Sequence, residues 1–172
     1  KKEVAQILAF DPVGKKETPS IYPSSLMGVF AVIRQAFLDV GYAQHQLSYH
    51  AKNPKTLPFY SHLGIEALSA VLKKQDAMPL WIETGSCLMT NRAIKLSQEF
   101  NLSPVLIATG DEWRRPELAC SKSLSYISPL IFPALANLKE KEDWEQISLD
   151  QLRAWDHSPS NPALLVKKTK SL

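Results

Sequence analysis

Residues 78–108 read MPLWIETGSCLMTNRAIKLSQEFNLSPVLIA, and this stretch decides the fold. Pro79-Leu80-Trp81-Ile82 is a short apolar run of the kind found in buried strands, and Val105–Ala108 is a second one. Between them, the segment from about Leu88 to Phe100 has the length and spacing of an amphipathic helix. Its inward face carries Ala93, Leu96 and Phe100.

A third apolar run, from Tyr126 to Phe132, predicts another strand after the turn Thr109-Gly110-Asp111-Glu112 and a short helix. Strand, turn, helix and strand therefore recur in order. Parallel strands need a long and usually helical crossover, so this alternation predicts a parallel sheet with helices on its faces. The fold class is α/β, with a βαβαβ core over residues 78–132.

The residues before this core predict a strand and two helices. Lys2–Phe10 is an apolar run that ends at Asp11-Pro12, and residues 13–23 read as a loop. Ser24-Ser25 stands where a helix N-cap belongs, and Gly41 is a natural end for that helix. The apolar stripe of the helix consists of Leu26, Val29, Phe30, Ile33, Phe37 and Val40.

A long polar excursion is predicted for residues 42–62, which are interrupted by proline. A second helix follows, with Ile65, Leu68, Val71 and Leu72 on one face. Residues 22–76 are thus predicted to form a helical segment with a long loop.

The last part of the chain, residues 145–172, predicts a helical corner. Ile147–Trp155 is amphipathic, and Asn161 in the corner after it is a candidate N-cap with Pro162 at the first helical position. Val166–Leu172 has the beginning of a strand pattern. A parallel sheet rarely stops within an element, so we expect the chain to be one partial domain, 1–172, cut from a longer protein.

Composition narrows the class of protein. The 172 residues suit one domain but are too few for a complete (β/α)₈ barrel, which needs at least ~200. A net charge of +3 with scattered basic residues argues against a nucleic-acid binder. No apolar run approaches the ~20 residues of a membrane span, and Lys1-Lys2-Glu3-Val4 lacks the apolar core expected of a signal peptide. Cys87 and Cys120, 33 positions apart in the sequence, could form one disulfide, but we expect two reduced thiols in a cytoplasmic protein.

Three stretches together resemble one family. They are YPSSLMG at residues 22–28 with Arg34-Gln35 in the following helix, Gly110-Asp111-Glu112-Trp113 after the second core strand, and Trp155 followed by Pro159 and residues 161–165, NPALL. Their order and spacing resemble the imidazolonepropionase-related amidohydrolases, in particular a divergent bacterial branch. The resemblance implies that the chain is part of a TIM-barrel, a (β/α)₈ barrel of the metal-dependent hydrolase type.

The same resemblance implies a metal-dependent hydrolysis of a non-peptide C–N bond, with histidine ligands at the carboxyl ends of barrel strands. Two of these positions fall inside the chain, at Glu83-Thr84 and at Thr109, and neither is a histidine. Threonine is a poor zinc ligand. We therefore expect no metal ligand and no cofactor in this chain, with a divalent metal such as zinc held elsewhere in the full-length protein.

Several residues at the strand ends are candidates for a site. Asp111 and Glu112 are candidates for catalysis, although acids in the first turn of a helix also serve as caps. Glu83 could replace a ligand or interact with the dipole of the following helix. Thr84, Thr109 and Arg114 are candidate binding residues, and Arg114-Arg115 could equally form local ion pairs.

The remaining residue types give no catalytic pattern. The four histidines, His45, His50, His62 and His157, show no metal-ligand spacing, and no glycine-rich phosphate loop occurs. The four tryptophans, Trp81, Trp113, Trp144 and Trp155, are interpreted as core or corner packing rather than as a stacking platform for a ligand.

Two functions of different class remain open. The first is an amidohydrolase-like hydrolase in the parent protein, to which this inactive segment contributes part of the barrel around a small-molecule substrate. The second is a non-catalytic small-molecule-binding or scaffold domain on the same fold. In both cases the strands needed to close a barrel are absent, so we expect apolar surface near the first or last strand that drives self-association or association with the rest of the barrel.

Overall fold

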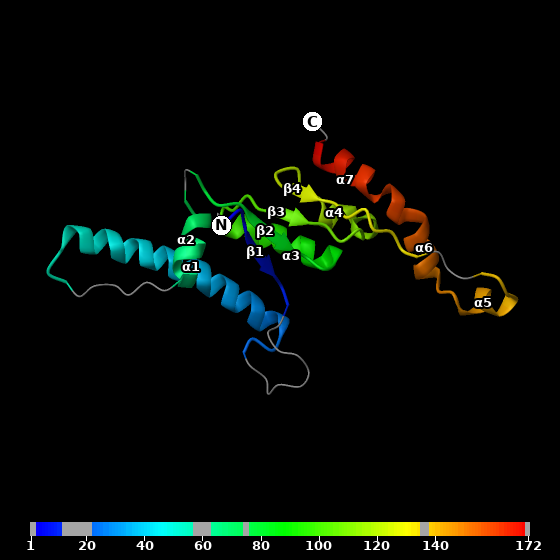
Figure 1. The fold of residues 1–172 in the computed structure, drawn as a ribbon, viewed down its shortest axis with the longest axis horizontal. Coiled ribbons are helices and arrows are strands. Elements are labelled where there is room, and N and C mark those ends of the chain that lie inside the picture. Colours follow the sequence, from blue (N-terminus) through cyan, green and yellow to red (C-terminus); the bar gives the residue numbers. More distant parts are fainter. Residues whose placement is uncertain (1–2, 12–21, 57–62, 74–75, 135–137, 171–172) are drawn as a thin grey trace. The chain divides into compact units, whose positions relative to one another are not determined.

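The predicted alternation of strands and helices is present in the computed structural model of the chain (Figure 1). The structure describes residues 3–11, 22–56, 63–73, 76–134 and 138–170. Most of the predicted loop 13–23, part of the predicted excursion 42–62 and the last two residues lie outside the described residues. The chain divides into two compact units, Lys1–Trp81 and Ile82–Leu172.

The second unit contains the core predicted from residues 78–132. β2 (Leu80–Glu83), at the boundary of the units, leads through α3 (Cys87–Glu99) to β3 (Val105–Ile107), and β4 (Ser125–Ile127) follows. β3 and β4 are parallel, with Leu106 opposite Tyr126. The four-stranded parallel sheet has the order β1-β2-β3-β4, so the predicted α/β class with parallel strands is confirmed.

Burial explains why these short apolar runs become strands. Ile82 and Leu106 are fully buried in the sheet, and Leu96 of α3 is buried with them. Each such side chain contributes about 1.5–3 kcal/mol when it leaves water. The helix itself begins at Ser86, whose side chain accepts a hydrogen bond from the Met89 N–H at 3.3 Å.

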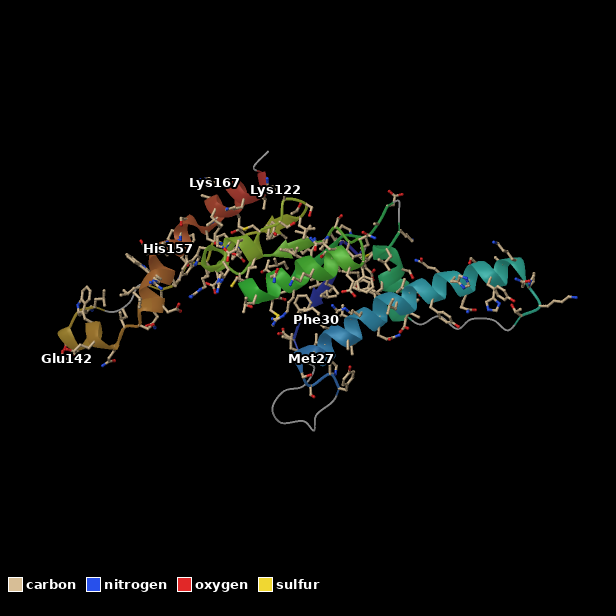
Figure 2. The ribbon with its side chains drawn as sticks, turned by 180° about the vertical axis from the view of Figure 1, so that it is seen from behind. Met27, Phe30, Lys122, Glu142, His157 and Lys167 are labelled. Carbon is tan, nitrogen blue, oxygen red and sulfur yellow. The ribbon has the colours of Figure 1, made fainter. Side chains whose placement is uncertain are left out.

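The first unit contains β1 (Gln6–Ala9), α1 (Leu26–Lys52) and α2 (Leu63–Val71). The predicted N-cap is confirmed, since the Ser25 side chain accepts a hydrogen bond from the Gly28 N–H at 3.2 Å. Phe10, after β1, stacks on Phe30 of α1 with ring centroids 4.8 Å apart. Figure 2 shows Phe30 and the strongly exposed Met27 near the beginning of the same helix.

The predicted end of this helix at Gly41 is wrong, because α1 continues to Lys52. A glycine inside a helix costs only about 1 kcal/mol relative to alanine. Val40 and Ala43, on either side of this glycine, are both buried, and α1 packs against α2. Their burial outweighs the glycine, and the predicted excursion starts only after residue 52.

α1 is also long and apolar enough to cross a membrane, judged by length and composition alone. The sequence prediction that no segment has this property is therefore corrected for this helix. Buried core helices and signal sequences pass the same test, and 22 % of the tested window of α1 is buried within the structure.

The C-terminal part of the second unit is helical. η1 (Glu112–Arg114) and α4 (Pro116–Ala119) precede β4, and four further elements follow it: α5 (Lys141–Gln146), α6 (Leu149–His157), η2 (Ser158–Ser160) and α7 (Asn161–Lys170). The predicted helix 147–155 corresponds to α6. α5 was not predicted; it begins with a capping box formed by Glu140 and Asp143.

Three predictions for this part are wrong. The third strand ends at Ile127 rather than Phe132, because Pro129 has no N–H to continue the ladder. Residues 166–170 are helical, since α7 buries Leu165 and continues to Lys170, so the argument from an interrupted strand does not hold. Asn161 is not an N-cap: its backbone is helical, with φ −59° and ψ −43°, and its side chain bonds elsewhere.

Candidate functional site

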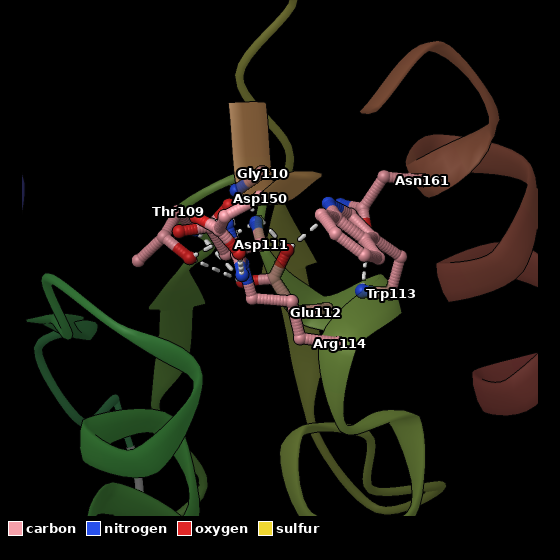
Figure 3. A network of polar contacts seen from close by, with 8 residues as sticks. All are labelled: Thr109, Gly110, Asp111, Glu112, Trp113, Arg114, Asp150 and Asn161. Atoms are coloured by element: carbon pink, nitrogen blue, oxygen red, sulfur yellow. Dashed lines mark hydrogen bonds and ion pairs between the residues drawn. The ribbon is translucent and has the colours of Figure 1, made fainter. Parts of the chain in front are cut away.

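The loop after β3 is organised around one buried carboxylate, that of Glu112 (Figure 3). Glu112 has no exposed surface. Its Oε1 accepts hydrogen bonds from the Thr109 N–H at 2.8 Å and from the Thr109 hydroxyl at 3.1 Å. Its Oε2 accepts from the Gly110 N–H at 3.1 Å and from Asn161 Nδ2 at 2.7 Å. Four donors thus converge on a single carboxylate.

Local sequence explains the loop side of this network. Gly110 has φ +90°, a conformation that L side chains rarely adopt, and it lets two consecutive N–H groups point at Glu112. The Thr109 hydroxyl also accepts a hydrogen bond from the Asp111 N–H at 3.2 Å. The loop at the carboxyl end of β3 is therefore fixed by its own residues and by the carboxylate three positions along the chain.

Asn161 links this loop to α7. Its Oδ1 accepts a hydrogen bond from the Trp113 N–H at 2.8 Å, while its Nδ2 donates to Glu112. The side chain is 1 % exposed, so both bonds are formed away from water. A buried hydrogen bond to a charged group contributes about 1.5–3 kcal/mol, which is more than most hydrogen bonds contribute. Asn161 therefore stabilises the position of the loop after β3 against α7.

These bonds decide what Glu112 can do chemically. A carboxylate that accepts four hydrogen bonds in a buried site has no free lone pair directed at a substrate. We therefore assign Glu112 a positioning role in the loop. Asp111, its neighbour, has a side chain that is 46 % exposed and lies 3.5 Å from Arg114 Nε, so it is the candidate acid that solvent can reach.

Glu83 and Thr84 lie at the end of β2, and Thr84, like Glu112, uses its polar side chain to hold the structure together. Thr84 is buried and donates a hydrogen bond to the Ile107 carbonyl at 3.0 Å, which joins the ends of β2 and β3. It also accepts one from the Thr90 hydroxyl of α3 at 3.1 Å. Glu83 is exposed. Thr84 is therefore committed to the sheet and Glu83 faces water.

These residues do not fit the metal centre that the resemblance implies. Zinc sites combine imidazole, thiolate and carboxylate ligands. Across the described residues, no three His, Cys, Asp or Glu side chains gather closely enough to hold a metal ion. The Glu112 carboxylate is occupied and the Thr84 hydroxyl is bonded on both sides.

Arg114 forms ion pairs rather than an open anion site. Its guanidinium donates to both carboxylate oxygens of Asp150 on α6, one of them at 3.0 Å, and also lies near Asp111 (Figure 3). It stacks over the Trp113 ring at 4.6 Å. The hydrogen bond from Arg114 lowers the pKa of Asp150, and the same bond raises the pKa of Arg114. Arg115 likewise pairs with Glu117 at 3.6 Å, as the ion-pair alternative predicted.

Replacing Arg114 by glutamine should raise the pKa of Asp150 towards the ordinary value for an aspartate. The hydrogen bond from Arg114 is the largest cause of the lowered pKa, whereas Arg153 contributes least. Carbon NMR titration of the Asp150 carboxyl measures the change, and Arg153→Gln is the matched control with a smaller effect. An Asp150 pKa that is the same in both variants would contradict this assignment.

The sign of the pH dependence follows from that lowered pKa. A carboxyl whose pKa is lower in the folded protein favours folding above its ordinary pKa. This contribution is lost as the pH falls through the folded-state value. Because Asp150 lies at the surface, solvent and salt screen the pair.

The Trp113 ring contacts the side chains of His157 and Arg114. Its ring lies 5.0 Å from the His157 ring and under the Arg114 guanidinium. Its Nε1 is the one buried side-chain polar atom of the described residues that has no hydrogen-bond partner. The packing prediction for this tryptophan agrees with these contacts.

Trp144 and Trp155 do not agree with the packing prediction. They are 58 % and 51 % exposed, and both line a cavity of about 530 Å³ in the second unit. The cavity is lined by residues of α5 and α6 and by Pro133, Ala134 and Leu138. Sequence reasoning missed it because it did not predict α5, which carries Trp144.

The other candidate residues lie apart from these groups. His45 and His50 are on α1, in the first unit, and His157 is on α6, whereas His62 lies outside the described residues. Both cysteines are free thiols. Burial raises the pKa of Cys120, which disfavours the reactive thiolate.

Comparison with known proteins supports the fold. A solved structure of an amidohydrolase from Thermotoga maritima MSB8 is similar to this chain, with a TM-score of 0.64 and 19 % sequence identity over 96 % of the chain. The chain spans 39 % of that protein's length. No protein-family model and no curated protein matches the chain. The chain therefore has an amidohydrolase-like fold.

Proposed function

We propose that this chain is one section of an imidazolonepropionase-related amidohydrolase, in which it builds part of a (β/α)₈ barrel. The observation that supports this most directly is the similarity to an amidohydrolase structure over 96 % of the chain. The parallel order of four consecutive strands is what a section of such a barrel would have. The remaining strands would come from other residues of the full-length protein.

In this proposal the full-length protein hydrolyses a non-peptide C–N bond of a small molecule. A divalent metal such as zinc would generate hydroxide from water near neutral pH. Residues outside this chain would bind that metal, because Thr84 and Glu112 are used in hydrogen bonds that hold the strand ends. The section itself would be inactive and would position loops for the rest of the barrel.

Two surface features support the assembly part of the proposal. In the first unit Ile7 of the outer strand β1 is exposed, and in the second unit Leu130 and Ile131, after the outer strand β4, are exposed. Exposed aliphatic residues at the edges of an open sheet are suited to contact with further strands or helices. The two free thiols are compatible with the cytoplasm, where we place the protein.

The experiment is metal analysis of the full-length protein together with a hydrolysis assay on a panel of small cyclic amides. The proposal expects about one divalent metal ion or more per chain and hydrolysis that a chelator abolishes. Glu83→Gln and Thr84→Val are the matched variants, and both should leave the metal content unchanged. Loss of the metal in Glu83→Gln would contradict the proposal that the ligands lie outside this section.

A second candidate function is binding of a small molecule without catalysis. The cavity beside Trp144 and Trp155 favours it, since its volume of about 530 Å³ falls within the ~300–1,000 Å³ of typical ligand pockets. A full-length protein that lacks metal and hydrolyses none of the cyclic amides would favour this second function over the first.

A further inference from the structure

The cavity between α5 and α6 has a lining that suits one class of ligand. Its walls carry the indole rings of Trp144 and Trp155 and the aliphatic side chain of Leu152, with Asp150 and Gln151 as polar groups. All of them belong to the second unit. The two indoles come from different helices, so the cavity depends on the tertiary arrangement and not on one amphipathic face.

The exposure of the two indoles is unusual for their type. Tryptophan is normally among the more buried residues, whereas Trp144 and Trp155 are here both more than half exposed. Two tryptophans of this exposure therefore line one cavity without being covered by the protein itself. An aromatic face attracts a cation through the negative charge density above the ring, and tryptophan does so best.

The charge of the segment points to the sign of the ligand. Residues 138–157, which form α5, α6 and the turn between them, contain six carboxylates and three cationic side chains. The segment thus has a net charge of −3 within a chain whose net charge is +3. Glu142, on α5, is one of these acids and is exposed (Figure 2). A cation approaching this segment is attracted, and an anion is repelled.

Asp150 has a separate part in the arrangement. Its carboxylate is held by Arg114, so it is fixed in place and does not neutralise a ligand alone. Among the described residues, Asp150 is the only acidic one that lines the cavity, so the two indoles and the net negative charge of residues 138–157 remain as the features that select the ligand. A ligand that has a diffuse positive charge and an apolar substituent suits both the indole rings and the negative charge of the segment. Such a ligand also needs few directed hydrogen bonds.

We propose that the Trp144–Trp155 cavity binds an organic cation, an alkylated ammonium group that carries an apolar or aromatic substituent. This inference is independent of the proposed hydrolase activity, because it uses residues that lie away from the strand-end positions. The trimethylammonium group would lie against the indole faces, and the apolar substituent would fill the space next to Leu152.

The test uses benzyltrimethylammonium as the probe and the full-length protein. Ring currents of the indoles should shift the N-methyl proton resonances upfield, and calorimetry should give a dissociation constant. Benzyl alcohol and phenylacetate are the neutral and anionic comparison probes, and both should bind at least tenfold more weakly. Trp144→Leu and Trp155→Leu should each raise the dissociation constant by about fivefold, as expected for loss of one cation–π contact.

Leu149→Ala is the matched control variant. Leu149 is an exposed residue of α6 that does not line the cavity, so its replacement should leave the dissociation constant unchanged. Both tryptophans are half exposed, and circular dichroism should therefore show folded variants. Three results would overturn the proposal. The first is no detectable binding of benzyltrimethylammonium at a 10-fold molar excess over ~1 mM protein, a concentration at which even a millimolar dissociation constant is measurable. The second is phenylacetate that binds as tightly as the cation, and the third is tryptophan variants that bind the cation like the wild type.

Discussion

Replacing Glu112 by alanine should lower the free energy of unfolding of the second unit by about 3 kcal/mol. The substitution leaves the Asn161 amide and the Thr109 and Gly110 N–H groups without their acceptor. A buried polar group that loses its partner costs about 1–3 kcal/mol, and water can reach part of this loop. Urea unfolding of the full-length protein measures the change.

Amide hydrogen exchange tests whether the loss of stability in the Glu112→Ala variant is located in the loop after β3. The Thr109 and Gly110 N–H groups donate to Glu112, so their exchange should accelerate in the variant well beyond that of the Leu106 strand. Glu117→Ala is the matched control, because Glu117 forms an exposed ion pair with Arg115 and its loss should change stability by at most about 0.5 kcal/mol. Unchanged exchange at Thr109 and Gly110 in the Glu112 variant would refute the positioning role.

Replacing Asn161 by aspartate should destabilise the second unit by about 3 kcal/mol at neutral pH. The change is isosteric, but it places a second carboxylate where Nδ2 lies 2.7 Å from Glu112 Oε2, and both side chains are buried. Two carboxylates at this distance cannot both be ionised without a large cost, so the pair retains a proton to unusually high pH.

The pH dependence of this variant has a defined sign. A group that holds its proton more tightly in the folded state than in the unfolded state favours folding at low pH. The Asn161→Asp variant should therefore be closest to the wild type near pH 4 and lose stability as the pH rises. Urea unfolding between pH 4 and pH 8 tests this, and a wild-type pH profile would contradict it.

A double variant provides the control. With Glu112→Gln and Asn161→Asp together, a carboxamide at position 112 can donate to the new carboxylate at position 161, which still accepts from the Trp113 N–H. One acceptor for the Gly110 N–H is lost. The double variant should therefore regain about half of the stability that Asn161→Asp loses, and it should lose the pH dependence.

The βαβ core and the helix starts could be predicted from the sequence because their causes are local. Leu80–Ile82 and Val105–Ile107 are apolar runs flanked by turn residues, and their side chains are buried wherever the sheet forms. Ser25 and Ser86 cap N–H groups only three residues away. Strand patterns and helix caps of this kind involve only residues that are close in sequence, so they can be recognised within a short stretch.

The errors in the fold have a common cause. The end of a helix at Gly41 was predicted from local propensity, but burial of Val40 and Ala43 overrides a cost of about 1 kcal/mol. Residues 166–170 have a strand-like composition, yet Leu165 is buried on a helix that begins at Asn161. In both cases a contact with another element outweighs the preference of the segment itself.

The candidate site shows most clearly which properties follow from the sequence alone and which depend on the tertiary structure. The sequence by itself determined that Thr109, Asp111 and Glu112 follow a buried strand, where the ends of parallel strands place functional loops, and that the positions expected for metal ligands hold no histidine. Only the tertiary structure decided what these residues do. Asn161, 49 positions after Glu112, completes the bonding of that carboxylate, and Asp150, 36 positions after Arg114, engages its guanidinium. The physical reason is that the hydrogen bonds and the exposure of a side chain depend on which distant element packs against it. The exposure of the two indoles of α5 and α6 depends on packing in the same way. No local sequence pattern encodes which element that is.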